Sequence, residues 1–178
     1  RVIGFDINSQ RLQELAQGVD STNETSPEEL RAAQLLELTS DPAQLPEADV
    51  FLVTVPTPID SAKRPDLTPL EKASISVGRA LKLRISTTTP VVIYESTVYP
   101  GATEEVCIPI LERESDLVLN EGFYCGYSPE RINPGDNEHK LATIVKVTSG
   151  SAAQAGAWVD SFYGSIIKAG THLAPSLK

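Results

Sequence analysis

The chain of 178 residues contains no methionine, one tryptophan and two cysteines. Cys107 and Cys125 lack the spacing of a metal or redox motif, and two histidines, His139 and His172, add too few ligands for a metal site. We therefore expect no bound metal. Because free cysteines are usually buried, we also predict that both thiols pack inside a protein of the reducing cytoplasm.

Basic residues are scarce as well. Lysine and arginine number 15 against 24 aspartates and glutamates, which gives a net charge of −9. Nucleic acids and anionic membranes select clustered positive charge, so this balance argues against both as partners. The sequence also has no apolar run near the roughly 18 residues that a membrane span needs.

What the sequence does contain is a regular alternation of short apolar runs with segments of helical period. Several of the runs are apolar almost throughout, as in strands buried on both faces. Strands are predicted at residues 2–7, 50–55, 91–95, 123–127, 144–148 and 166–169. The alternation predicts an α/β fold in which crossover helices join the strands of a doubly wound parallel sheet.

The helices are predicted from their starting residues. Ser26 and Thr68 are each followed by a proline and, three residues on, by a glutamate, a pattern typical of a helix start. Ser151 is a weaker capping residue. A short first helix should end at Gly18. A helix over residues 103–114 should be kinked by Pro109.

Four segments place polar residues where a strand ends. Asp6 ends the first strand, where an acidic residue accepts hydrogen bonds from the adenosine ribose of a dinucleotide; the alternative is a cap of the next helix. The sequence Val53-Thr-Val-Pro-Thr-Pro58 leaves the second strand, so Thr57 either contacts a cofactor or sits in a rigid connector.

The next two segments are Tyr94-Glu-Ser-Thr-Val-Tyr-Pro-Gly101 and Gly126-Tyr-Ser-Pro-Glu-Arg-Ile-Asn-Pro-Gly-Asp136. Ser96 and Thr97 either cap a helix or line the cleft where nicotinamide and substrate meet. Glu130 is a candidate general base at a strand end, with a surface ion pair as the alternative.

Together these motifs resemble a known family. D-x-N, V-P-T-P, E-S-T-V-x-P-G and S-P-E-R-x-x-P-G stand in an order and spacing similar to those of the UDP-glucose/GDP-mannose dehydrogenase family of nucleotide-sugar 6-dehydrogenases, over residues 2–178. Residues 66–69, 94–101 and 130–136 look most like the branch that oxidises UDP-N-acetylhexosamines for bacterial surface polysaccharides. The UDP-glucose branch carries a second glutamate where this sequence has Pro134.

The resemblance implies a Rossmann-like fold that binds NAD and a UDP-sugar whose C6 alcohol is oxidised to a carboxylate by two NAD. It implies an NAD site at the strand ends, made of Asp6, Arg11, Val55, Pro56, Thr57, Ser96 and Thr97. Thr97 would also position water or the reacting oxygen, and Glu130 would act as a base. Glu130, Arg131 and Asn133 would contact the substrate.

The family's first strand and G-x-G-x-x-G turn have no counterpart in these residues. We therefore interpret residues 1–178 as a partial NAD-binding domain that starts at the second strand and ends before the central helix and substrate domain. The family's reactive cysteine matches neither Cys107 nor Cys125. Since the family dimerises through its central helix, we expect a homodimeric full-length protein and a monomeric fragment.

Two other interpretations stay open. The chain could come from a UDP-glucose 6-dehydrogenase, which an assay of the full-length protein on both sugars would distinguish. It could also be a non-catalytic nucleotide-binding or interaction module that kept the fold and lost the chemistry.

The 178-residue chain alone is expected to form no NADH from UDP-N-acetylglucosamine, because the resemblance implies that the family's phosphate-binding turn, its catalytic lysine and its reactive cysteine lie outside these residues. It should bind NAD weakly, since each lost charge-assisted hydrogen bond to the pyrophosphate is worth ~1.5–3 kcal/mol. Calorimetry measures that affinity. A micromolar Kd, or NADH formation by this chain, would show that the interpretation is wrong.

Overall fold

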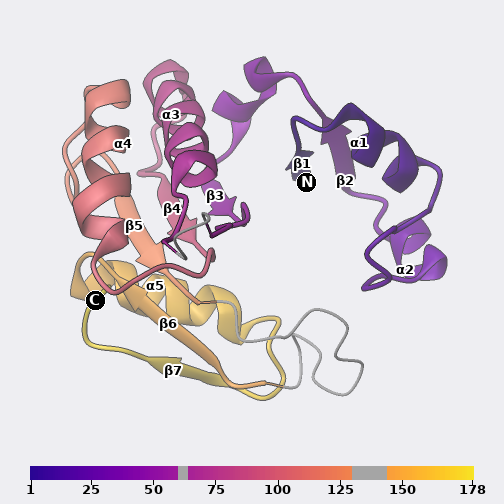
Figure 1. Cartoon of the computed structure of the whole chain (residues 1–178). Coiled ribbons are helices and arrows are strands. Elements are labelled where there is room, and N and C mark those ends of the chain that lie inside the picture. Colours follow the sequence, from indigo (N-terminus) through magenta and orange to yellow (C-terminus); the bar gives the residue numbers. More distant parts are fainter. Residues whose placement is uncertain (60–63, 130–143) are drawn as a thin grey trace. The chain divides into compact units, whose positions relative to one another are not determined.

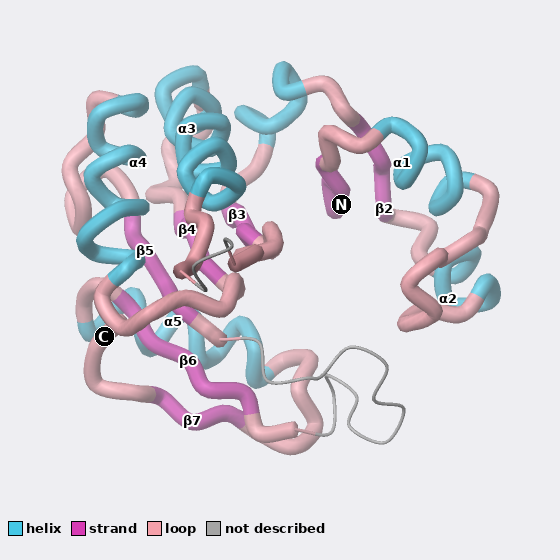
Figure 2. Tube along the Cα trace, viewed as in Figure 1, coloured by secondary structure: helices cyan, strands magenta, loops and turns pink. Residues whose placement is uncertain are grey.

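The computed structural model describes residues 1–59, 64–129 and 144–178. The chain divides into two compact units, Arg1–Ala48 and Asp49–Lys178, and each is described by itself. Figures 1 and 2 show the elements of both. Within the three described ranges, no helix combines the length and the hydropathy that crossing a membrane requires.

The first unit is built on two parallel strands. Strand β1 (Val2–Phe5) pairs with β2 (Leu36–Thr39), and the chain between them forms helices α1 (Ser9–Ala16) and α2 (Pro27–Ala32) before the 3-10 helix η1 (Pro42–Glu47) ends the unit. The first predicted strand and the first two predicted helices are confirmed. Strand β2 was not predicted.

The helix ends of this unit follow capping chemistry. The predicted capping box at α2 is present: the Ser26 hydroxyl accepts from the Glu29 amide at 3.2 Å, and the Glu29 carboxylate accepts from the Ser26 amide at 2.9 Å. Gly18 follows α1 at φ +77°, a left-handed conformation that glycine adopts at little cost.

A buried carboxylate holds the loop between α1 and α2. Asp20 accepts hydrogen bonds from the Arg11 guanidinium at 2.6 Å, from the Thr22 hydroxyl at 2.7 Å and from the Thr25 amide at 2.9 Å. Burial raises the pKa of Asp20, but the hydrogen bonds from Thr22, Arg11 and the loop amides outweigh it and hold the pKa well below its usual value. The carboxylate charge therefore stabilises this loop.

The second unit contains a five-stranded sheet in the order β3-β4-β5-β6-β7. Its strands are β3 (Val50–Val53), β4 (Val91–Tyr94), β5 (Tyr124–Tyr127), β6 (Lys146–Gly150) and β7 (Thr171–Leu173). Strands β3, β4 and β5 are parallel, as predicted, with Val53, Tyr94 and Tyr127 in register. Strand β6 is antiparallel to β5, so the parallel prediction is wrong at this pair. To pair with β5 in parallel, the chain would first have had to cross back to the end of the sheet at which β5 begins.

Helices lie on both faces of this sheet (Figure 2). Side chains alternate along β4, so Val91 and Ile93 face one way and pack with Val159 and Tyr163 of α5 (Ala153–Gly164). Tyr94 faces the other way, and its hydroxyl lies 2.8 Å from the hydroxyl of Ser74 on helix α3 (Thr68–Leu83). This two-sided burial is the doubly wound arrangement that the apolar strands predicted.

Two predicted elements differ from the structure. Residues 166–169 form turns and not a strand, because the amides of Ile166 and Ile167 both bond back to the carbonyl of Tyr163 at the end of α5. Ser151 does not cap α5: the cap position is Ala152, and the Ser151 hydroxyl accepts from the Cys125 amide at 3.1 Å.

The helices on the α3 side also begin differently from the prediction. Thr68 is the first residue of α3 (Thr68–Leu83) and not its cap, and its amide donates to the Asp66 carboxylate at 2.9 Å. The helix predicted over residues 103–114 is present: a π-helix (Thr103–Cys107) leads into α4 (Ile108–Ser115), and the helix type changes directly before Pro109. The widened π turn stands where proline, which lacks an amide donor and whose ring crowds the preceding turn, disturbs the hydrogen bonds of a regular α-helix.

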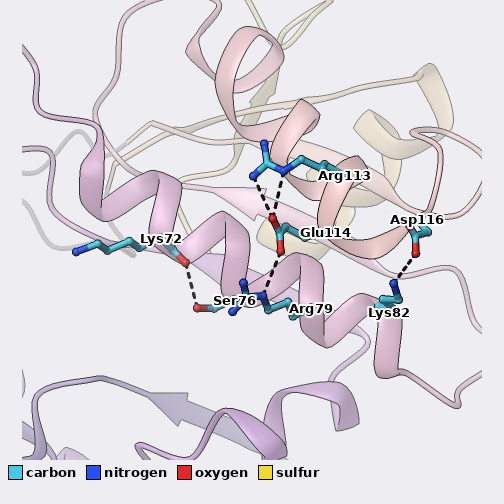
Figure 3. Close-up of polar contacts among 7 residues, drawn as sticks. All are labelled: Lys72, Ser76, Arg79, Lys82, Arg113, Glu114 and Asp116. Atoms are coloured by element: carbon cyan, nitrogen blue, oxygen red, sulfur yellow. Dashed lines mark hydrogen bonds and ion pairs between the residues drawn. The ribbon is translucent and has the colours of Figure 1, made fainter.

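Helices α3 and α4 pack closely side by side. An added Cβ at Gly78 would lie 2.7 Å from the Glu114 Cβ, so only glycine fits at this crossing. Around it the Glu114 carboxylate accepts from Arg79 and Arg113, each at 3.1 Å, and Lys82 pairs with Asp116 at 2.5 Å (Figure 3). The two guanidiniums, Arg113 foremost, hold the pKa of Glu114 below its usual value.

Gly78→Ala should destabilise the full-length protein by about 1–3 kcal/mol, because the added methyl group meets α4. Gly164→Ala is the matched control. An added Cβ there meets nothing within 4 Å at the end of α5, so this exchange should stabilise by about 0.4–1 kcal/mol. Urea unfolding measures both. Equal effects of the two exchanges would contradict the close packing of α3 on α4.

Asp20→Asn should lower the free energy of unfolding by about 1–3 kcal/mol at pH 7, because a charged acceptor of several hydrogen bonds is lost. The folded-state pKa of Asp20 is depressed, so the wild-type advantage is complete above the unfolded pKa of about 3.9 and shrinks as the pH falls below it. Denaturation at pH 7 and pH 3 measures the gap. A gap that widens at pH 3 would contradict the role of the carboxylate.

Candidate functional site

A pocket of about 290 Å³ opens where β3 and β4 end, and residues 54–57 and 95–97 line it. Ligands of open α/β sheets bind at the carboxyl ends of parallel strands, so this position is the one expected for a cofactor. Val55, Pro56, Thr57, Ser96 and Thr97, all predicted site residues, line this one pocket. The structure therefore brings together five residues that the sequence separates into two loops.

A hydrogen bond joins the two loops that form the pocket. The buried Ser96 hydroxyl donates to the Val55 carbonyl at 2.6 Å, and the Glu95 amide donates to the Val53 carbonyl at 2.9 Å. Ser96 therefore fixes the distance between the loops. Neither Ser96 nor Thr97 caps the following helix, whose cap position is Ala102.

Thr57 carries an unsatisfied polar atom. Its Oγ1 is buried and, among the residues that the structure describes, has no hydrogen-bond partner. Leaving a buried hydroxyl unpaired costs about 1–3 kcal/mol, which a ligand with a matching donor or acceptor would recover. Thr97 on the facing loop is exposed, so its hydroxyl is accessible to a bound molecule.

Behind the pocket lies a buried ion pair that was not predicted from the sequence. Glu95 accepts from the Lys146 ammonium at 2.9 Å and from the Tyr163 hydroxyl at 2.5 Å. Lysine is rarely fully buried unless it is paired, so Lys146 in the otherwise apolar run 144–148 was the one available signal.

Asp6 and Arg11 lie in the first unit. Asp6 Oδ1 accepts from the Asn8 amide at 2.8 Å, and Asn8, not Asp6, is the cap of α1. The alternative of Asp6 as the helix cap is thus wrong. The Arg11 guanidinium bonds Asp20 at 2.6 Å and the Ser21 hydroxyl at 3.1 Å, so its orientation is fixed within this unit.

The predicted base and sugar contacts, Glu130, Arg131 and Asn133, lie outside the described residues. The chain leading to them is anchored at Ser128, which is fully buried. Its amide donates to the Tyr94 carbonyl at 2.9 Å and its hydroxyl donates to the Val147 carbonyl at 2.7 Å. The exit of β5 is therefore fixed beside the exit of β4.

The two cysteines are buried and free, as predicted. Burial raises the pKa of Cys107 to about 11 and raises that of Cys125 well above its usual value. A nucleophilic cysteine needs an accessible thiolate, so neither residue suits covalent catalysis. The part of the chain that the structure describes also holds no group of three potential metal ligands.

A larger pocket of about 540 Å³ lies elsewhere in the second unit, beside the start of α5 and residues 173–177. Its lining is mainly apolar and includes none of the predicted site residues. Because β6 is antiparallel to β5, this pocket, at the carboxyl ends of β6 and β7, lies at the other end of the sheet from the exits of β3 and β4, where the predicted cofactor residues gather.

Comparison with known proteins identifies the same family as the motifs. The model of the UDP-glucose/GDP-mannose dehydrogenase family, NAD binding domain, matches residues 1–167. A UDP-N-acetyl-D-glucosamine 6-dehydrogenase of Pseudomonas aeruginosa is 57% identical over 99% of this chain, and one of Salmonella typhi is 52% identical over 100%. The chain spans 41% of the length of each of these relatives.

Solved structures share the fold. A UDP-D-ManNAc dehydrogenase of Pyrococcus horikoshii superposes with a TM-score of 0.85 at 28% identity, over 99% of this chain and 41% of that one. A GDP-mannose dehydrogenase of Pseudomonas aeruginosa gives a TM-score of 0.86 over the same shares at 24% identity, which supports the fold alone. The chain belongs to the UDP-glucose/GDP-mannose dehydrogenase family and carries its NAD-binding domain, of Rossmann-like α/β fold.

Proposed function

We propose that this chain is the NAD-binding part of a nucleotide-sugar 6-dehydrogenase that oxidises the C6 alcohol of a UDP-N-acetylhexosamine to the uronate with two NAD. The observation that carries the proposal is the pocket where the unpaired Thr57 hydroxyl, Ser96 and Thr97 meet. The printed names of the two relatives at 57% and 52% identity support the sugar. The rest of the enzyme would correspond to the part of these relatives that the chain does not span.

Each unit, taken by itself, holds residues that fit one part of NAD. In the first unit Asp6 Oδ1 is used by Asn8, and Oδ2, for which no partner occurs among the described residues, is available to an adenosine ribose hydroxyl. Arg11 would lie beside the adenosine with its guanidinium held by Asp20. In the second unit the buried Thr57 hydroxyl would pair with the nicotinamide half.

NAD, when bound, supplies the hydride acceptor. The chain's own residues would orient the reacting groups: Ser96 holds the two loops at a fixed separation, and the exposed Thr97 hydroxyl would hold water or the sugar oxygen. Glu130 would act as the base, with Arg131 and Asn133 on the sugar. The covalent step would use a cysteine other than the two buried ones, because their raised pKa values keep them as thiols.

The proposal extends to the setting of the enzyme. Two buried free thiols and the need for NAD and a UDP-sugar support a cytoplasmic location. The family resemblance supports a homodimer of the full-length protein and a role in making surface polysaccharide. Residues 1–178 would then be the part of the NAD-binding domain from its second strand onward, and the rest of the enzyme would complete it.

The full-length protein is expected to form two NADH for each UDP-N-acetylglucosamine consumed, because an alcohol becomes a carboxylate through an aldehyde. UDP-glucose should be a poorer substrate, since Pro134 replaces the second glutamate of that branch. Absorbance at 340 nm and analysis of the sugar product measure both. A higher kcat/KM for UDP-glucose would reverse the substrate assignment, and no turnover of either sugar would favour the non-catalytic module.

Thr57→Val in the full-length protein should leave the melting temperature unchanged or raise it, because the lost hydroxyl is buried without a partner. The same variant should weaken NAD binding about fivefold or more, which corresponds to one hydrogen bond of about 1 kcal/mol. Thr148→Val is the matched control: its hydroxyl donates to Asp160 at 2.7 Å, so this exchange should lower the melting temperature. Unchanged NAD affinity in Thr57→Val would remove Thr57 from the site.

A further inference from the structure

The buried group behind the pocket consists of Glu95, Lys146 and Tyr163, from three different places in the second unit. Glu95 follows β4, Lys146 begins β6 and Tyr163 lies near the end of α5. The Lys146 side chain is 4% exposed and that of Glu95 14%. Glu95 also lines the pocket itself.

Each oxygen of the Glu95 carboxylate has its own donor. Oε2 accepts from the Lys146 ammonium at 2.9 Å, and Oε1 accepts from the Tyr163 hydroxyl at 2.5 Å. The Lys146 ammonium also lies 5.4 Å from the centre of the Tyr163 ring, within the range of a cation–π contact. The side chain of Glu95 is therefore held in one orientation by two rigid elements.

Stability alone does not account for this group. Taking two charges out of water costs several kcal/mol per ion, and well-packed apolar residues of similar volume are often equally stable or more so. A charged group at the wall of a site instead imposes a unique geometry on what is attached to it. Here the attached segment is the turn of Ser96 and Thr97, which directly follows Glu95 in the chain.

We propose that Glu95, Lys146 and Tyr163 are positioning residues that set the direction in which the chain leaves β4, and with it the place of the Thr97 hydroxyl relative to Thr57. The proposal rests on the dehydrogenase function proposed for this site. The Glu95 amide is bonded to Val53 and the Ser96 hydroxyl to Val55, so the Glu95 side chain provides the third attachment of the turn. Releasing it would let Thr97 shift, and a displacement of about 1 Å near the chemistry costs up to about 100-fold in rate.

The test compares three variants of the full-length protein. Lys146→Met leaves the Glu95 carboxylate buried without its cation. The triple variant Glu95→Leu, Lys146→Met, Tyr163→Phe replaces all three members of the group by apolar side chains, so neither charge of the ion pair stays buried without the other. Lys82→Met is the matched control, because Lys82 forms an ion pair with Asp116 on the exposed side of α3 (Figure 3).

The positioning role predicts that the triple variant keeps the wild-type melting temperature but loses about tenfold or more in kcat, with KM for UDP-N-acetylglucosamine changed less than about threefold. Hydrogen exchange at the amides of Ser96, Thr97 and Val98 should be faster than in the wild type. Lys146→Met should show the same faster exchange together with a lower melting temperature. Lys82→Met should match the wild type in melting temperature, kcat, KM and hydrogen exchange.

Two results separate this inference from the proposed function. If the triple variant keeps both the wild-type kcat and the wild-type exchange rates, the group is only structural and the positioning role is wrong. If the wild type itself oxidises no UDP-sugar, the proposed function fails, and hydrogen exchange at the three amides alone decides whether the group fixes the turn.

Discussion

The parallel register of β3, β4 and β5 is the constraint on which the site depends. Val53, Tyr94 and Tyr127 are aligned across three strands, so the chain leaves all three at one edge of the sheet. Only this register places the Ser96 hydroxyl 2.6 Å from the Val55 carbonyl. A slip of one residue would turn every side chain to the opposite face and separate the two loops.

Some polar side chains of the site are hydrogen-bonded within the protein, and others are left for a ligand. Behind the pocket, Glu95 uses both carboxylate oxygens and Ser96 uses its hydroxyl, so these groups are preorganised before anything binds. At the pocket, the Thr57 hydroxyl is buried without a partner among the described residues, and the Thr97 hydroxyl is exposed. Rigid support with a few free polar groups is the arrangement that dinucleotide and substrate recognition requires.

The sequence predicts those parts of the fold in which local pattern and tertiary burial agree. Strands β3 to β5 are apolar throughout, and the Ser26 capping box is formed by residues three apart. The strand predicted at residues 166–169 is wrong because the two isoleucines follow the end of α5 and Ile167 packs against β4, and a short apolar run does not distinguish such a helix end from a strand. The loop residues were found through their motifs, whereas the Glu95–Lys146 pair joins residues 51 positions apart and depends on the strand order.

We propose that the reacting end of NAD occupies the pocket at the ends of β3 and β4. A crystal structure of the full-length protein with NAD tests it most directly. We expect the nicotinamide half in that pocket, with a polar atom within hydrogen-bond distance of Thr57 Oγ1 and the Thr97 hydroxyl facing the ring. A nicotinamide placed elsewhere, with Thr57 Oγ1 still unpaired, would contradict it.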